Sequence, residues 1–218
     1  MPIKARWNMF ADTLSLRTRR HPCCQCQKSR VSCQSAITDI IWPMANILIS
    51  YSTTDGHTRS ICERLQQVIE DQQHTVAVSW MSEEPDIDLG PFDTVVIGAS
   101  IRYGKHQPQV FEFIRKNQVA LESKPSAFFS VNVVARKPEK NQPETNPYLQ
   151  KFLTKISWEP KNLAVFAGKI DYPRYGFIDR QMIRLIMWMT KGPTDPTVTI
   201  EFTDWGEVEK FGRRIASL

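Results

Sequence analysis

The chain has 218 residues, with 28 lysines and arginines against 23 aspartates and glutamates, and a formal net charge of +5. Hydrophobic residues make up 41% of it, a share typical of a globular domain of ordinary size with a full core. No apolar run approaches the roughly 20 residues that a membrane-spanning helix needs. The positive charge favours an anionic partner, such as a membrane surface, a nucleic acid or an acidic substrate.

The first 43 residues differ in composition from the rest. They are rich in Arg, Ser and Gln and show no sustained hydrophobic periodicity. Four of the five cysteines lie here: Cys23, Cys24, Cys26 and Cys33. Their spacing fits no two-by-two zinc template, so we predict no metal site. An Arg-rich, acid-poor segment is also typical of an organellar transit peptide. We favour a disordered or non-native extension over residues 1–43, with Met44 as the natural start and one folded domain over residues 44–218.

From Ala45 onward, short apolar runs alternate with amphipathic patterns, which indicates an α/β fold with helices covering a parallel sheet. The predicted strands are 46–51, 75–79, 94–99, 126–131 and 163–167. The predicted helices are 57–72, 107–121, 178–189 and 205–216. Five such strands predict a doubly wound sheet of order 2-1-3-4-5. In that order, a ligand binds at the carboxyl ends of strands one and three.

Two segments are additional to a minimal domain with five parallel strands. Residues 133–160 form a long insertion between strands four and five, and a connection of this length is usually functional or disordered. Tyr172-Pro-Arg-Tyr-Gly-Phe177 leads into the strongly apolar helix 178–189. Its longest uncharged run, 185–190, is too short to span lipid. The helix can lie in a membrane interface, aided by anionic headgroups, or pack inward as a core helix.

The first turn of the predicted sheet has the composition of a phosphate cradle. Tyr51-Ser-Thr-Thr-Asp-Gly-His-Thr58 lies between a strand and a helix, so backbone N–H groups, hydroxyls and the helix dipole can converge on one anion. Neither the Walker lysine nor the three glycines of a dinucleotide turn are present, which favours a mononucleotide such as FMN. An ordinary capped helix start has a similar composition. The predicted contacts are Ser52, Thr53, Thr54, Asp55, Gly56, His57 and Thr58.

Two further turns reach the same edge of the sheet. Strand three ends in Gly98-Ala-Ser-Ile-Arg-Tyr-Gly104, where Tyr103 can stack on a planar ring and Arg102 can offset charge on a reduced flavin. Ser130-Val-Asn132 ends strand four, and its backbone can bond to the polar edge of the ring. The predicted contacts from these turns are Ser100, Ile101, Arg102, Tyr103, Gly104, Ser130, Val131 and Asn132.

These strings resemble known families. Tyr51-x-Thr53-x-x-Gly56-x-Thr58 is similar to the flavodoxin signature for the FMN phosphate, although Ser50, Cys62 and Glu63 depart from the common pattern. The longer strings resemble the quinone-dependent protoporphyrinogen IX dehydrogenases of gamma-proteobacteria. They are Val96-Ile-Gly-Ala-Ser-Ile-Arg-Tyr-Gly104, Pro125-Ser-Ala-Phe128, Ser130-Val-Asn132, Val134-Ala-Arg-Lys-Pro-Glu-Lys140 and Tyr172-Pro-Arg-Tyr175. The resemblance covers Ala45 to the C-terminus and implies a flavodoxin-like fold.

The resemblance implies an FMN enzyme of haem biosynthesis, bound peripherally to the cytoplasmic face of the cell inner membrane. It would remove six electrons from protoporphyrinogen IX and pass them to menaquinone or ubiquinone. Because the flavin carries the chemistry, no catalytic side chain is assigned. Cations that can bind the two substrate propionates are Arg136, Lys137, Lys140 and Arg174, unless they belong to a solvated basic loop.

Three other functions fit parts of the pattern. An electron-carrier flavodoxin is disfavoured by the net positive charge. An NAD(P)H-dependent quinone reductase would need a second phosphate turn, which we do not find in the sequence. A basic membrane-binding module without catalysis would not need the flavin turns. Aromatic residues are not interleaved with the basic ones, so we expect no nucleic-acid binding.

Overall fold

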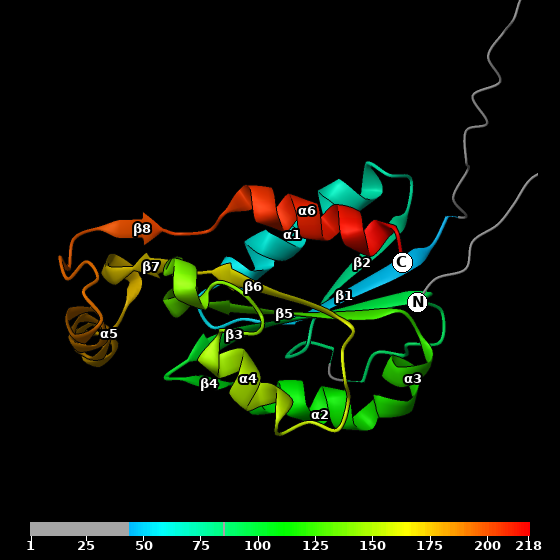
Figure 1. Cartoon of the computed structure of the whole chain (residues 1–218), viewed down its shortest axis with the longest axis horizontal. Coiled ribbons are helices and arrows are strands. Elements are labelled where there is room, and N and C mark those ends of the chain that lie inside the picture. The colour runs from blue at the N-terminus through cyan, green and yellow to red at the C-terminus, as the bar shows by residue number, and fades with distance from the viewer. Residues whose placement is uncertain (1–43, 85) are drawn as a thin grey trace, which may run out of the picture. The chain divides into compact units, whose positions relative to one another are not determined.

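The structure is a computed structural model that describes residues 44–84 and 86–218. The predictions for residues 1–43, including the absence of a metal site there, lie outside the described residues. Five parallel strands form the central sheet in the order β2-β1-β3-β5-β6 (Figure 1). They are β1 (Asn46–Ser52), β2 (Thr75–Trp80), β3 (Thr94–Arg102), β5 (Ser126–Asn132) and β6 (Asn162–Ala167). This order confirms the predicted doubly wound sheet. The two-residue strand β4 (Lys105–His106) adds an antiparallel pair to the end of β3.

The strands read as continuous apolar runs because helices cover both faces of the sheet. On one face lie α1 (His57–Glu70) and α6 (Trp205–Ala216) (Figure 1). Ile61 and Leu65 of α1 and Phe211 of α6 share one buried cluster with the sheet. The two helices pack closely: a Cβ on Gly212 would lie 2.9 Å from Cγ1 of Val68.

The other face is covered by α2 (Pro108–Lys116), α3 (Gln118–Ser123) and α4 (Pro147–Leu153) (Figure 1). The sequence predicts one helix over 107–121, but the helix breaks at Asn117, whose backbone leaves helical geometry. The Nδ2 group of Asn117 donates to the carbonyl of Phe113 at 3.0 Å, and such local bonds compete with a continuing helix.

The predicted insertion between the fourth and fifth parallel strands is an ordered crossover. It contains η1 (Val133–Arg136), η2 (Pro138–Lys140) and α4. Asn146 caps α4 by accepting hydrogen bonds from the backbone N–H groups of Tyr148 and Leu149. Leu149, Phe152 and Trp158 are buried against the sheet, so this segment completes the second core layer.

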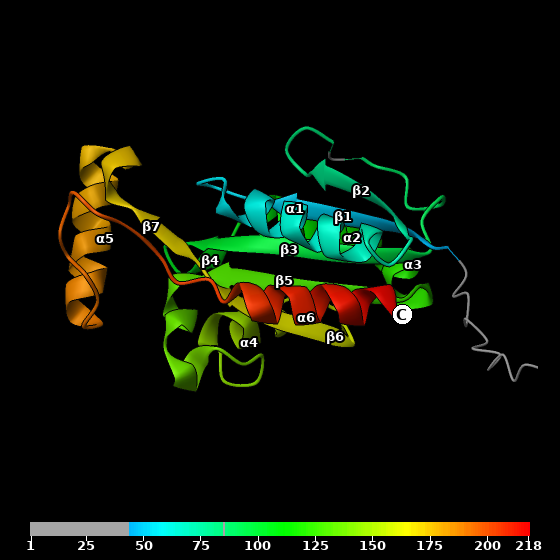
Figure 2. The same ribbon diagram turned by 90° about the horizontal axis from the view of Figure 1, so that it is seen from above.

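A second insertion lies between β6 and α6. It contains β7 (Lys169–Asp171), η3 (Tyr172–Arg174), α5 (Phe177–Met189) and β8 (Thr199–Glu201). β7 and β8 pair antiparallel, and α5 lies beyond the carboxyl ends of the parallel strands (Figures 1 and 2). Met187 packs with Ile170, Tyr172 and Tyr175 in a small core of its own. Within the described ranges, no helix has the length and apolarity required to cross a bilayer.

Candidate active site

The turn between β1 and α1 presents free backbone donors. Gly56 has a φ of 85°, a left-handed conformation that favours glycine, and Thr53 Oγ1 accepts a hydrogen bond from its N–H group at 3.0 Å. Among the described residues, no acceptor is paired with the N–H groups of Thr54, Asp55, His57 and Thr58. Together with the start of α1, these groups form an anion site at the carboxyl end of β1.

A side-chain donor adds to these N–H groups. Thr58 is 1% exposed, and its Oγ1 atom is buried without a hydrogen-bond partner in the described part of the chain. A buried hydroxyl without a partner carries a desolvation cost that an anionic acceptor would remove. The predicted role of Thr58 therefore fits its position.

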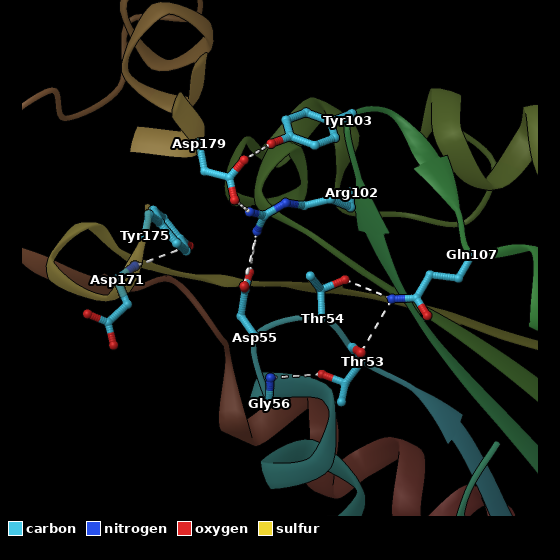
Figure 3. A network of polar contacts seen from close by, with 10 residues as sticks. All are labelled: Thr53, Thr54, Asp55, Gly56, Arg102, Tyr103, Gln107, Asp171, Tyr175 and Asp179. Carbon is cyan, nitrogen blue, oxygen red and sulfur yellow. Dashed lines mark hydrogen bonds and ion pairs between the residues drawn. The ribbon is translucent and has the colours of Figure 1, made fainter. Parts of the chain in front are cut away.

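Gln107, which sequence analysis missed, supports this turn from the start of α2. Its Nε2 group donates to Thr54 Oγ1 at 2.8 Å and to the carbonyl of Thr53 at 3.3 Å (Figure 3). Its Oε1 atom accepts from Ser52 Oγ at 2.8 Å. Ser52 is fully buried, so its side chain braces the turn instead of facing a ligand. Only the three-dimensional structure brings these residues together, since Gln107 and Thr54 are 53 positions apart.

The carboxyl end of β3, which extends three residues beyond the predicted strand to Arg102, is tied to both the first turn and α5. Nη1 of Arg102 bonds to Asp55 Oδ1 at 3.0 Å and Oδ2 at 2.8 Å (Figure 3). Its Nη2 atom bonds to Asp179 Oδ2 at 2.6 Å, and the hydroxyl of Tyr103 bonds to Asp179 Oδ1. The bond from Tyr103, followed by the charge of Arg102, lowers the pKa of Asp179.

This arrangement corrects the expectation for Arg102. Its guanidinium faces two carboxylates, so the group carries a net charge of −1 and offers no free positive charge to a reduced flavin. Tyr103 has a φ of 50°, which is uncommon for a residue with a side chain, and such conformations concentrate at ligand sites.

A single cavity joins the three predicted turns. The predicted contacts that line it are Thr53, Asp55, His57, Thr58, Ser100, Ile101, Arg102, Tyr103, Gly104, Val131 and Asn132. Residues that sequence analysis missed complete it: Val133, Val134, Tyr148, Gly168, Lys169, Ile170, Tyr175, Ile183, Ile186 and Met187. The last three come from α5, which therefore covers the cavity with apolar side chains. Thr54 and Gly56 line a neighbouring cavity on the outer side of the phosphate turn.

Comparisons with known proteins agree with this geometry. A family model described as "Flavodoxin domain" matches residues 48–197. The chain is 48% identical over 173 residues to a protein of Escherichia coli strain K12 named protoporphyrinogen IX dehydrogenase (quinone), covering 78% of this chain and 94% of that one. The chain belongs to the flavodoxin-domain family.

A second relative carries the same name. The protein of that name from Leishmania major is 41% identical over 172 residues, which cover 78% of this chain and 74% of that one. Among solved structures, oxidised Flavodoxin 1 from Bacillus cereus aligns over 79% of this chain and 98% of its own, with 12% identity and a TM-score of 0.48.

The cofactor of this flavodoxin domain is FMN, and the residues present fit it. Unpaired N–H groups and the buried hydroxyl of Thr58 suit the phosphate. At the other end of the cavity, Nδ2 of Asn132 is buried without a partner among the described residues. Its Oδ1 atom accepts hydrogen bonds from the backbone N–H of Ala135 at 3.0 Å and from Nδ2 of Asn146 at 3.3 Å, which fix the amide beside the cavity that Asn132 lines.

His57 is a neutral member of the phosphate turn. Thr203 donates its hydroxyl proton to the carbonyl of Ala167 at 2.9 Å, so Nε2 of His57, 2.6 Å from Thr203 Oγ1, must donate to that oxygen. Burial lowers the pKa of His57. The ring therefore keeps Nδ1 as an acceptor, which suits a hydroxyl of the ribityl chain.

Like that of Ser52, the side chain of a second predicted contact, Ser130, does not face the cavity. The side chain of Ser130 is fully buried, and its hydroxyl lies 3.0 Å from Nε2 of His106. Burial lowers the pKa of His106 to about 4. Ser130 therefore belongs to a neutral internal pair, and the predicted contact through the backbone at this strand end stays a prediction. β5 is buried on both faces, so its polar and apolar residues do not alternate in a pattern that would show on which face the Ser130 side chain lies.

The four predicted substrate cations are not brought together. Nη2 of Arg136 bonds to the carbonyl and hydroxyl of Thr190 at 3.1 and 3.0 Å, where it caps the end of α5. Arg174 lines the outer cavity beside the phosphate turn. Lys137 and Lys140 lie on the crossover before α4 and line none of the cavities around the phosphate turn. The structure gives Arg136 a role in holding α5, and binding of propionates by the four cations stays a prediction.

Proposed function

We propose that this chain oxidises protoporphyrinogen IX to protoporphyrin IX, using bound FMN, and passes the electrons to a respiratory quinone. The observation that carries the proposal is the 48% identity over 94% of the E. coli protein whose name states this activity. The cavity supports it, because the three turns that lie at its edge are suited to a phosphorylated planar ring.

Different residues of the chain have different roles at this site. When bound, FMN supplies the two-electron redox chemistry, and three such oxidations remove the six electrons and six protons by which substrate and product differ. Thr58 and the free N–H groups hold the phosphate, and Asn132 orients the ring. Ile183, Ile186 and Met187 exclude water from the ring. No side chain at the cavity is assigned as a proton acceptor.

The proposal is tested by following porphyrin fluorescence without oxygen. The purified, FMN-loaded chain should form protoporphyrin from protoporphyrinogen IX only when menaquinone or ubiquinone is added. Activity with NADPH and quinone, and none with the porphyrinogen, would point to the reductase instead.

The acceptor lies in a membrane, and one surface suits peripheral attachment there. Several apolar side chains of α5 face solvent: Phe177 and Ile178 are each 76% exposed and Trp188 is 72% exposed. Arg180 and Lys191 flank them with positive charge. A contiguous exposed apolar face rimmed by basic residues is typical of helices that lie in an anionic interface.

We therefore propose that α5 rests on the cytoplasmic face of the cell inner membrane. Its opposite side lines the flavin cavity through Ile183, Ile186 and Met187. One helix would then lie between the lipid and the site, and a quinone would have a short path from the bilayer to the cavity. Figure 2 shows α5 standing free of the two helical layers, where a flat surface can reach it.

A further inference from the structure

We infer that Lys169 binds the phosphate of FMN and makes the site select FMN over riboflavin, which lacks that phosphate. The inference rests on the proposed FMN cofactor. Sequence analysis treats the cradle as one without a lysine, because none follows Gly56 in the turn itself. The structure supplies one from a distant part of the chain.

The fold places Lys169 at the edge of the sheet where the phosphate turn lies. β6 ends at Ala167, and the N–H group of Gly168 donates to the carbonyl of Asn132 at 3.3 Å. Lys169 follows directly as the first residue of β7. It lines the inner cavity together with Thr58 and the outer cavity together with Gly56. Lys169 therefore lines both of the cavities that the phosphate turn lines.

The charge of Lys169 is not neutralised within the described residues. Glu201 lies directly opposite it in the β7–β8 pair, yet the two side chains form no salt bridge. Two of the three arginines that line the two cavities are paired with carboxylates, and the third, Arg174, is exposed to solvent. Arg59 pairs with Glu63 at 2.9 Å, and Arg102 pairs with Asp55 and Asp179. A half-buried lysine without a counterion, at the mouth of a cavity, is available for an anion.

A second observation independently points to an anion at the same place. Thr58 Oγ1 is buried without a partner and belongs to the first turn of α1, which begins at His57. Burial lowers the pKa of His57, the negative charge of Glu201 raises it, and the positive charge of Lys169 lowers it by a smaller amount, so Lys169 and Glu201 both lie close enough to act on this turn. A phosphate monoester carries a charge of about −1.5 to −2 at pH 7, and lysine binds such groups as a point charge.

The test compares two ligands that differ only in the phosphate. Apoprotein is titrated with FMN and with riboflavin, and binding is followed by quenching of flavin fluorescence. K169M keeps the aliphatic stem and removes the charge, K169R keeps the charge, and K155M removes a charge from an exposed lysine at the far end of α4.

We expect K169M to weaken FMN binding at least tenfold and to leave riboflavin binding within twofold. K169R should retain FMN within about threefold, and K155M should bind both ligands as the wild type does. The 31P resonance of bound FMN should also shift between the wild type and K169M. Thermal unfolding of each apoprotein shows whether it is folded, and K169Q replaces K169M if the methionine variant is not.

Three results would overturn the inference. Equal FMN affinity in the wild type and K169M would remove Lys169 from the phosphate site while leaving the FMN cofactor in place. An equal loss of both ligands would show a role in the fold instead of in phosphate selection. Failure of the wild type to bind either flavin would remove the cofactor itself, and the inference with it.

Discussion

The carboxylate of Asp179 accepts a hydrogen bond from the guanidinium of Arg102 at 2.6 Å, although the two residues are 77 positions apart. This contact joins the first turn of α5 to the turn after β3 (Figure 3). The same guanidinium holds Asp55 of the phosphate turn, so one side chain fixes three segments around the flavin cavity. The position of α5 over the site and the charge beside the ring therefore depend on the same residues.

Replacing Asp179 by Asn should raise the reduction potential of bound FMN. The Asp55–Arg102–Asp179 group carries a net charge of −1, and an amide in place of one carboxylate makes it neutral. Addition of electrons to the flavin is then less opposed, and we expect a rise of about 30 mV, the equivalent of about 1.4 kcal/mol for a two-electron couple. Spectroelectrochemical titration of the loaded protein measures the potential directly.

The matched control is Asp195→Asn, which removes the same charge from an exposed site where, among the residues that the structure describes, the carboxylate bonds only to Thr197. Its potential should equal that of the wild type. An unchanged or lower potential in Asp179→Asn would contradict the electrostatic role of this group.

Thr58→Ala should weaken FMN binding without weakening the apoprotein. The lost hydrogen bond to a charged phosphate corresponds to about 1.5–3 kcal/mol of binding free energy. The hydroxyl has no partner among the described residues, so its removal should leave the free energy of unfolding of the apoprotein unchanged or slightly raised. Thr58→Ser keeps the donor and should bind FMN nearly as the wild type does. Full FMN affinity in Thr58→Ala would contradict the phosphate assignment.

Gln107→Ala should lower FMN affinity although Gln107 supports the turn from outside the cavity. The substitution removes the bonds to Ser52, Thr53 and Thr54 that hold the phosphate turn, and we expect a loss of about 1 kcal/mol in binding free energy. Calorimetric titration with FMN measures it. Gln118→Ala, which removes only an exposed pair with Glu122, is the control. Equal FMN affinities in the two variants would show that the hydrogen bonds of Gln107 do not contribute to FMN binding by the phosphate turn.

His106 should make the fold sensitive to mild acid. Its pKa is about 4 in the folded chain against an ordinary value of 6.5, so between these values the unfolded chain binds a proton that the folded chain does not. The free energy of unfolding should therefore fall as the pH is lowered from about 6.5 to 4, by about 3 kcal/mol from this residue.

Urea unfolding of the wild type and of His106→Phe at several pH values separates this contribution from that of the other titrating groups. The decrease between pH 6.5 and 4 should be smaller by about 3 kcal/mol in the variant. Parallel curves for the two proteins would show that His106 titrates normally.

The exposed face of α5 should mediate vesicle binding. The triple substitution of Phe177, Ile178 and Trp188 by Ser removes its most exposed large side chains, and burial of each is worth roughly 1.5–3 kcal/mol. Sedimentation with anionic vesicles should recover the wild type and leave the variant in the supernatant. Val119→Ser, at an 82% exposed site on α3, should behave as the wild type. Equal sedimentation of all three would contradict attachment through α5.

The layout of the sheet and most of the cavity could be predicted because each depends on local sequence. Buried parallel strands are continuous apolar runs, and the turns that follow them must meet at one edge of the sheet. From the sequence alone, that rule places Thr58, Tyr103 and Asn132 at the same edge. Applied to the fifth predicted strand, which ends at Ala167, it would also have pointed to Lys169.

The rest depends on contacts between distant segments. β7 and β8 have three residues each, too few for a periodic pattern. The basic character of Arg136 suggested a contact with the substrate. Its observed partner is Thr190 at the end of α5, which lies 54 positions further along the chain, so the sequence could not show this contact. Arg102 was expected to offset charge on a reduced flavin, but the two carboxylates that oppose its charge come from segments 47 and 77 positions away.

The central claim is tested most directly by an anaerobic titration of the FMN-loaded chain with protoporphyrinogen IX, followed by flavin absorbance. The account predicts that the substrate bleaches the oxidised flavin bands and that menaquinone or ubiquinone restores them, while NADPH has no effect. Flavin bands that stay unchanged with excess porphyrinogen would contradict it.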